Sequence, residues 1–397
     1  ELCEERGMTM TLALEGIKVI EMGTFGPAGF ASGWLGDMGA DVIMVESPSN
    51  RAMSTDWREG GRTRAVHCRN KRSIVLDLKT GEARTILHQL AKTTDVLIEA
   101  NRPGIAKRLG FDYETLSTIN PRIIVCSVTG YGQSGPYAQI PGHGLVWEAT
   151  AGWLRMHGQG YGNMGGDYTG RPWLNYFNLP DMKGSSNTMV SILLALYARE
   201  KVGVGQYLDL ALFDGVIAVK DAPVPQEGDG AFTHVRPSWN VYECKDGKYI
   251  AFAAGEEVQW RNLCEAIGLP ALAKERGASE QRGQEIIQIF NKTFKTRTRD
   301  EWFAQISKVD TEVAKVNSID EARDDPQVKT RGMHVEVVGD GGQRETQYGN
   351  PFRLSKTPGR AVHTRAPKAG EHTDKILSGI GYAPADIRRL RQAGAVK

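Results

Sequence analysis

The sequence predicts an α/β fold, in which a doubly wound parallel sheet forms a large domain and a small α+β domain accompanies it. Two observations carry this prediction. Short β-rich runs alternate with helix-like runs over the first 130 residues, which is typical of a parallel sheet covered by helices. After a cluster of Pro, Gln, Glu, Gly and Asp at 223–230, one strand and several helices replace the alternation, and this change indicates a second domain extending to about residue 325.

The elements of the large domain follow from these runs in chain order. Expected strands are 17–21, 39–46, 72–77, 94–99 and 123–128, and the expected helices are 30–38, 81–92 and 113–120. Apolar residues at helical spacing, among them Val190, Leu193 and Leu194, predict a long helix over 182–199. A strand over 207–212 is expected after it.

The remaining segments are less regular. Residues 128–178 are rich in glycine and aromatic side chains and show little periodicity, which predicts long, ordered loops. The small domain is expected to hold a strand over 248–253 and helices over 258–267, 281–294 and 299–309. Two strands are predicted within 332–355 around a glycine-rich turn at 339–343, and the tail from 369 is expected to be partly helical.

Composition excludes several classes of protein. Lys and Arg number 49 against 47 Asp and Glu, and no long basic run marks a nucleic-acid or membrane surface. The five cysteines lack Cys-x-x-Cys spacing, so we expect neither disulfides nor a metal site, and a cytoplasmic location. No apolar run approaches the ~18 residues of a membrane span. The charged residues 1–12 are unlike a signal peptide and are expected to be a disordered lead-in.

A glycine-rich turn, 23–29, joins the first predicted strand to the first helix. A dinucleotide site requires Gly-x-Gly-x-x-Gly here, because the turn, the pyrophosphate and the helix packing each need a glycine. The glycines of this turn have a different spacing, which disfavours an NAD site. Two interpretations stay open. The turn either binds another ligand at the carboxyl edge of the sheet, or it is a tight turn without a ligand.

Three polar residues are candidates for chemistry. Asp181 follows Pro180 at the mouth of the long helix, where a carboxylate either stabilises the helix terminus or acts as a nucleophile. His143 lies in Pro-Gly-His-Gly and Glu257 in Ala-Gly-Glu-Glu-Val-Gln-Trp. Taken alone, each is more typical of a polar surface residue than of an acid or base. Together with Asp181 they would form a set that transfers protons.

Several segments together match a known family. They are 14–21, 35–46, 70–79, 102–104, 120–124, 130–137, 198–200, 203–214, 298–302 and 325–328. With these segments the chain resembles the family III CoA-transferases, the group that includes formyl-CoA transferase, carnitine CoA-transferase and α-methylacyl-CoA racemase. The resemblance spans about residues 13–375.

The resemblance implies an architecture. It would comprise a Rossmann-like large domain made from residues 1–220 and 330–397, with a small domain at 225–325. Two ring-shaped subunits would interlock in a homodimer, and a heteromer is the alternative assembly. The substrates would be an acyl-CoA and a small carboxylic acid, with no tightly bound cofactor and no nucleic-acid or membrane partner.

The resemblance also implies site residues. The family's nucleophilic aspartate falls on Asp181, which would form an anhydride with the donor's acyl group and then a thioester with CoA. Contacts to CoA would fall on Phe25, Gly26, Pro27, Leu76, Lys79, Asn101 and Arg108. Lys79 and Arg108 suit the phosphates of CoA chemically. Ala100-Asn101 departs from the Asn-Phe common at this place in the family.

Alternative activities stay open. In the racemase branch a histidine, an aspartate and a glutamate would correspond to His143, Asp181 and Glu257, and would move the α-proton of an acyl-CoA. That branch reads Gly-His-Asp, whereas Gly144 follows His143 here. A non-catalytic subunit of a heteromeric transferase is a further reading, and the retained Asp181 weighs against it. An NAD oxidoreductase is the most remote alternative.

Overall fold

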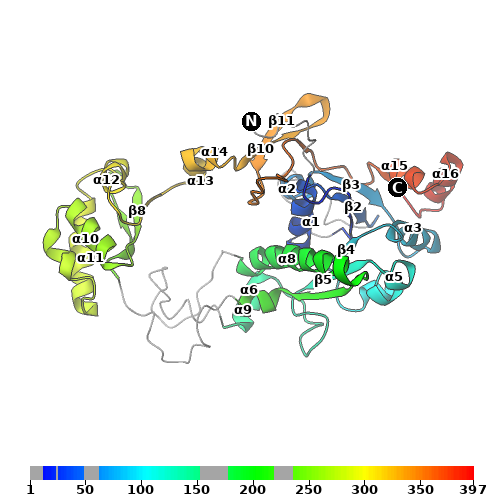
Figure 1. Cartoon of the computed structure of the whole chain (residues 1–397), viewed down its shortest axis with the longest axis horizontal. Helices are drawn as coiled ribbons and strands as arrows, with labels where there is room; N and C mark the ends of the chain where they lie inside the picture. The colour runs from blue at the N-terminus through cyan, green and yellow to red at the C-terminus, as the bar shows by residue number, and fades with distance from the viewer. Residues whose placement is uncertain (1–11, 24–25, 49–61, 153–177, 219–235) are drawn as a thin grey trace. The chain divides into compact units, whose positions relative to one another are not determined.

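The computed structural model describes residues 12–23, 26–48, 62–152, 178–218 and 236–397 (Figure 1). The chain divides into two compact units. The first, called here the large unit, consists of Glu1–Ala151, Tyr176–Lys220 and Arg331–Lys397. The second, the small unit, consists of Gly152–Asn175 and Asp221–Thr330. The predicted lead-in at 1–11 and the cluster at 223–230 lie outside the described residues.

A six-stranded sheet forms the centre of the large unit. Its order is β3-β2-β1-β4-β5-β6, and every neighbouring pair is parallel. The strands are β1 (Lys18–Glu21), β2 (Asp41–Glu46), β3 (Lys71–Val75), β4 (Val96–Glu99), β5 (Ile124–Thr129) and β6 (Tyr207–Ala211). The prediction of a parallel α/β sheet is therefore confirmed. β1 and β4 are neighbours where the strand order reverses, and ligands of such sheets bind beyond the carboxyl ends of the strands at that point.

Helices cover both faces of this sheet because alternate strand residues point to opposite sides. Ile20 and Leu97 belong to a buried cluster with α3 (Gly81–Ala91), α15 (Thr373–Gly379) and α16 (Pro384–Gln392). Val19 and Ile98 belong to a second cluster with α1 (Pro27–Asp37) and α8 (Leu179–Val202). Segments from both ends of the chain thus build the large unit (Figure 1).

Short elements complete the large unit. They are α2 (Arg62–Cys68), α4 (Ile105–Leu109), α5 (Tyr113–Ile119), α6 (Gly144–Thr150) and α9 (Leu212–Ala218), with a hairpin of β10 (His334–Val338) and β11 (Arg344–Tyr348) that β12 (His363–Thr364) joins. The hairpin turn at Asp340–Gly342 falls within the predicted glycine-rich turn.

The small unit has its own core. β7 (Trp239–Glu243), β8 (Tyr249–Ala253) and β9 (Val313–Val316) form an antiparallel sheet. Its helices are α10 (Glu257–Ala266), α11 (Glu280–Phe294), α12 (Arg299–Ile306), α13 (Ile319–Asp324) and α14 (Pro326–Thr330). Aromatic rings dominate the buried cluster, where Tyr242 stacks on Phe294 and Trp260 on Phe290.

One prediction about elements was wrong, and one predicted helix has a different start. The expected loop at 128–178 contains α6, whose two buried residues, Trp147 and Glu148, are too few to create a periodic pattern. The long helix begins at Leu179 rather than at 182, because Pro180 occupies its first turn, where a missing N–H is tolerated. Among the residues described here, none of the helices combines the length and apolar character needed to cross a bilayer.

Candidate functional site

The first turn of α8 carries Asp181. The helix starts after Asn178, whose backbone is left-handed, with φ 44° and ψ 49°. Nδ2 of Asn178 donates a hydrogen bond of 2.7 Å to Oδ2 of Asp181. The carboxylate is half-buried, and the positive end of the helix dipole stabilises a negative charge there. Within the described part of the chain Oδ1 has no hydrogen-bond partner, so one carboxylate oxygen is held and the other is available.

The short helix α6 packs against this turn. A Cβ built on Gly144 would collide with Oδ1 of Asn178, so the backbone of α6 lies directly against the Asn178 side chain. One helical turn further, Oε1 of Glu148 accepts a hydrogen bond of 3.2 Å from the amide of Leu179. His143 is the N-cap residue of α6 and is exposed. The structure therefore brings His143 and Asp181 into neighbouring turns, although 38 positions separate them in the sequence.

The turn after β1 approaches α8 from the other side. Gly184 follows Asp181 by one turn, and a Cβ built on it would lie 3.2 Å from Cβ of Pro27, the first residue of α1. Gly26 precedes α1 with φ 67°, and the position of its absent Cβ has no atom within 4 Å. The predicted ligand turn thus has open space beside it and contacts the helix that bears Asp181. Phe25 lies outside the described residues.

The other predicted CoA contacts follow β3 and β4. Lys79 and Arg108 are exposed, as a phosphate contact requires. Asn101 is half-buried and uses its amide and side chain to bind Oε2 of Glu99 at 2.7 and 3.0 Å. The Leu76 side chain is buried in the core, so only its backbone could meet a ligand.

A buried ion pair supports the first turn. Nζ of Lys71 lies 2.6 Å from Oε2 of Glu21, and both side chains are fully buried. The same ammonium group donates to the carbonyl of Gly29 and the hydroxyl of Ser32, both in α1. This ties the carboxyl end of β1 to the start of α1. This pair was missed from the sequence, where the available signal was a lysine at the start of a buried strand.

Glu257 lies in the small unit. It is the first residue of α10 and is exposed, and the preceding Glu256 forms a capping box with Gln259. The large unit therefore holds Asp181 and His143, and the small unit holds Glu257.

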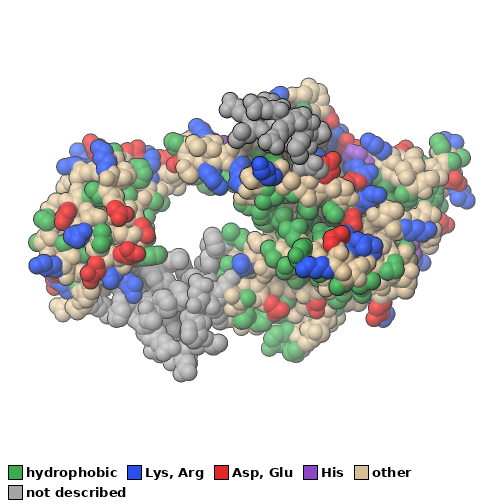
Figure 2. Space-filling view, viewed as in Figure 1, with side chains coloured by type: hydrophobic (Ala, Val, Ile, Leu, Met, Phe, Trp, Pro, Cys, Tyr) green, Lys and Arg blue, Asp and Glu red, His purple; other side chains and the backbone are tan. Residues whose placement is uncertain are grey.

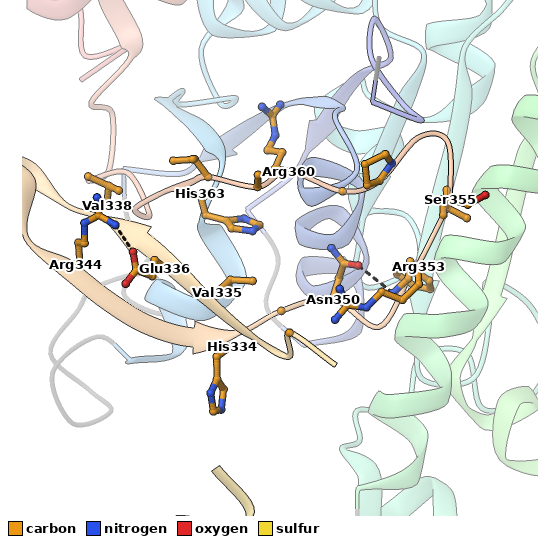
Figure 3. Close-up of a pocket in the computed structure, with 18 residues that line it drawn as sticks. His334, Val335, Glu336, Val338, Arg344, Asn350, Arg353, Ser355, Arg360 and His363 are labelled. Atoms are coloured by element: carbon orange, nitrogen blue, oxygen red, sulfur yellow. Dashed lines mark hydrogen bonds and ion pairs between the residues drawn. The ribbon is translucent and has the colours of Figure 1, made fainter. Parts of the chain in front are cut away.

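A separate cleft of ≈ 780 Å³ opens in the large unit between β10 and the segment 349–363 (Figure 3). Arg344 pairs with Glu336 there, and Arg360 donates to the carbonyl of Gly36. None of the predicted site residues lines this cleft, and its one carboxylate is already paired. Across the described ranges, no three His, Cys, Asp or Glu side chains gather closely enough to hold a metal ion.

Comparison with known proteins places this geometry in context. Residues 14–373 match the model of CoA-transferase family III. The chain is 32% identical to the succinyl-CoA–L-malate CoA-transferase beta subunit of Chloroflexus aurantiacus, over 97% of this chain and 98% of that one. It is also 32% identical to the succinate–glutarate CoA-transferase of Agrobacterium fabrum, over 92% and 95% of the two chains.

Two further similarities bear on the site and the fold. The human α-methylacyl-CoA racemase is 28% identical over 96% of each chain. The crystal structure of a CAIB/BAIF family protein from Brucella suis superposes with a TM-score of 0.77 at 27% identity, and covers 93% of this chain and 100% of that one.

Proposed function

Because this chain belongs to CoA-transferase family III and is a CoA-transferase, we propose that Asp181 carries the groups that pass between the donor and the acceptor. The single observation that supports this role most strongly is the local geometry of Asp181. It combines one oxygen fixed by Asn178, a second oxygen without a hydrogen-bond partner among the described residues, and a place in the first turn of α8.

The proposed reaction runs through two covalent intermediates. The Asp181 carboxylate attacks the thioester carbonyl of the donor, the C–S bond breaks, and the products are a mixed anhydride and the CoA thiolate. The thiolate then attacks the Asp181 carbonyl, which gives an aspartyl-CoA thioester and releases the donor's carboxylate. The acceptor carboxylate repeats these two steps in reverse and leaves as the new acyl-CoA. No redox change occurs, and Asp181 returns as a carboxylate.

CoA is proposed to bind along the carboxyl edge of the sheet. Gly26 and Pro27 would meet it at the turn before α1, and Leu76 would meet it through its backbone. Asn101 would contact it after β4, while Lys79 and Arg108 would pair with its phosphates. The open space beside Gly26 and the exposure of Lys79 and Arg108 support this path.

The acids exchanged are proposed to be short dicarboxylic acids. The names of the two relatives at 32% identity specify succinyl-CoA with L-malate and succinate with glutarate. The test is a screen in which the purified chain receives succinyl-CoA with malate, glutarate or a monocarboxylic acid, and the new CoA thioester is identified by mass. Formation of a dicarboxylyl-CoA supports the proposal, whereas transfer to monocarboxylic acids alone contradicts the substrate class.

An acyl-CoA racemase is the second candidate, because α6 places His143 beside the Asn178–Asp181 turn. In that reaction His143, Asp181 and Glu257 would remove and return the α-proton of an acyl-CoA. Incorporation of deuterium at the α-carbon in deuterated water, without any acceptor acid and lost in His143→Ala, would favour the racemase. Transfer between acids without such exchange favours the transferase.

A second subunit is proposed to cover one face of α8. Hydrophobic side chains gather on the side of the large unit that shows α8 (Figure 2). Met182, Val190, Leu194 and Tyr197 are each more than half exposed, although all are large and apolar. Two copies or a related chain would fit, because one relative is named as the beta subunit of a transferase. Light scattering of the purified chain tests whether it forms a homodimer alone.

A further inference from the structure

We propose that Glu148 is a positioning residue for Asp181. Its carboxylate accepts a hydrogen bond from the first turn of α8, as an N-cap side chain would, and thereby fixes the orientation of the Asp181 carboxylate. The inference rests on the proposed role of Asp181. Neither the family resemblance nor the sequence pattern pointed to Glu148.

The start of α8 lacks a cap of its own. A helix leaves its first amides without partners inside the helix, and the preceding side chain usually accepts from one of them. Thr80 does so for α3, Asp112 for α5 and Ser279 for α11. The side chain of Asn178 makes no such bond, because its amide group is turned forward to Asp181.

Glu148 supplies the missing acceptor from another helix. Its Oε1 lies 3.2 Å from the amide nitrogen of Leu179, and Pro180 has no amide hydrogen to satisfy. The Asn178 side chain is thereby released to hold the Asp181 carboxylate. Because Glu148 accepts the hydrogen bond from Leu179, the Asn178 side chain does not have to cap α8 and can bind the Asp181 carboxylate instead.

The face of α6 that carries Glu148 fits this role. Gly144 and Glu148 lie four residues apart, so they share one face of the helix. Gly144 contacts Asn178, and Glu148 binds the amide of Leu179. Asn178 and Leu179 are the two residues that precede Pro180, which Asp181 follows. A side chain at 144 would push Asn178 away. Both contacts on this face of α6 are thus made with the segment that leads into Asp181.

The chemical cost of Glu148 also argues for a role. The residue is only 1% exposed, and burying a carboxylate is unfavourable unless hydrogen bonds compensate. Burial raises the pKa of Glu148, the bond from Leu179 lowers it, and the nearby charge of Asp181 raises it further. A neutral apolar residue would pack at lower cost but would leave the amide of Leu179 without a partner.

Three variants of the 397-residue chain test the inference. Glu148→Ala removes the acceptor, Glu148→Gln keeps an oxygen at the same distance, and Ser279→Ala is the matched control. The control also removes a cap bond, that of α11 in the small unit, and Ser279 has no proposed part in binding or catalysis. Each variant is assayed for kcat, for KM of the acyl-CoA donor and for unfolding in urea.

The expected result separates positioning from a general loss of stability. Glu148→Ala should lower kcat by about 10-fold or more while KM changes less than about 2-fold. The reason is that the variant loses the orientation of the Asp181 carboxylate but keeps the residues that bind the donor. Glu148→Gln should recover kcat to within about 3-fold of the wild type, since an amide oxygen also accepts from Leu179. Ser279→Ala should lose a similar amount of stability and keep its kcat.

Other outcomes overturn the inference. An unchanged kcat in folded Glu148→Ala contradicts it, and so does a Glu148→Gln variant as impaired as Glu148→Ala. If Glu148→Ala does not fold, Glu148→Asp withdraws the acceptor by one methylene and must then show the same loss of kcat with unchanged KM. A wild-type protein that transfers CoA without modification at Asp181 refutes the proposed function itself. A normal wild type with insensitive Glu148 variants refutes only the role of Glu148.

Discussion

Asn178 and Asp181 are joined by a hydrogen bond of 2.7 Å from Nδ2 to Oδ2 across the first turn of α8. Asn178 is one of two residues other than glycine with a positive φ in the described part of the chain. Strained backbone conformations of this kind are held by their surroundings and often occur at functional sites. The bond explains why an unfavourable backbone angle is kept at this position.

Two substitutions of Asn178 should separate the effect of its backbone strain on stability from the effect of its hydrogen bond on kcat. Asn178→Gly and Asn178→Ala both remove the hydrogen bond, and we expect both to lower kcat by about 10-fold, in line with the loss of one orienting contact. Asn178→Ala should in addition be less stable than Asn178→Gly by about 1 kcal/mol, because alanine disfavours the left-handed conformation. Steady-state kinetics and urea unfolding give the two readouts. Equal stability of the two variants would contradict the backbone argument.

Gly184 should be sensitive to any side chain. A Cβ there would collide with Leu212 and press on Pro27, so Gly184→Ala should push α8 away from the turn before α1. We expect a higher KM for acyl-CoA and a loss of stability of about 1–3 kcal/mol, the usual cost of overpacking. Gly379→Ala is the control, because its Cβ would meet nothing within 4 Å and the position is helical. That variant should be as stable as the wild type or more stable, with unchanged KM.

The buried pair of Lys71 and Glu21 should be essential to the large unit. Lys71→Met removes the ammonium group that lies 2.6 Å from the buried carboxylate of Glu21, and removing one partner of a buried ion pair costs about 3–5 kcal/mol. Adding Glu21→Gln removes the buried negative charge that Lys71 balances, so the double variant should regain part of the lost stability. Urea unfolding of the two variants and the wild type measures this. A double variant less stable than Lys71→Met would contradict the account.

Asp37 should make the protein sensitive to acid. Burial acts to raise the pKa of Asp37, but hydrogen bonds from His363 and Arg69 outweigh it and lower the pKa to about 2. Because the folded value lies below the unfolded value, the contribution is present above about pH 5 and is lost as the pH falls towards 2. The shift corresponds to roughly 2 kcal/mol. Stability measured against pH should fall less steeply for Asp37→Asn over this range, and parallel curves would refute the assignment.

The sheet could be predicted from the sequence because its strands are short apolar runs separated by helices. Local periodicity was enough for α3 and α5, whose start residues, Thr80 and Asp112, are also recognisable caps. Asp181 was predicted as either a residue that stabilises the helix terminus or a nucleophile, and the resemblance favoured the nucleophile.

The support around Asp181 could not be predicted in the same way. Glu148 binds Leu179 over 31 positions of sequence, and a single acidic residue in an irregular stretch has no periodic signal. Lys71 reaches Glu21 over 50 positions, and its place at the start of a buried strand does not reveal which carboxylate it binds. Such contacts depend on how elements pack. One sign in the sequence was available for the left-handed conformation of Asn178. It is an asparagine two positions before a proline that lies in the first turn of a helix.

The most direct test of the central claim is chemical trapping at Asp181. The protein is incubated with succinyl-CoA and hydroxylamine, digested, and the peptide containing Asp181 is analysed by mass spectrometry. We predict a hydroxamate on Asp181 that requires the acyl-CoA and is absent from Asp181→Asn, which should also lose transfer activity. Transfer of CoA between acids without modification of Asp181, or with full activity in Asp181→Asn, would contradict the account.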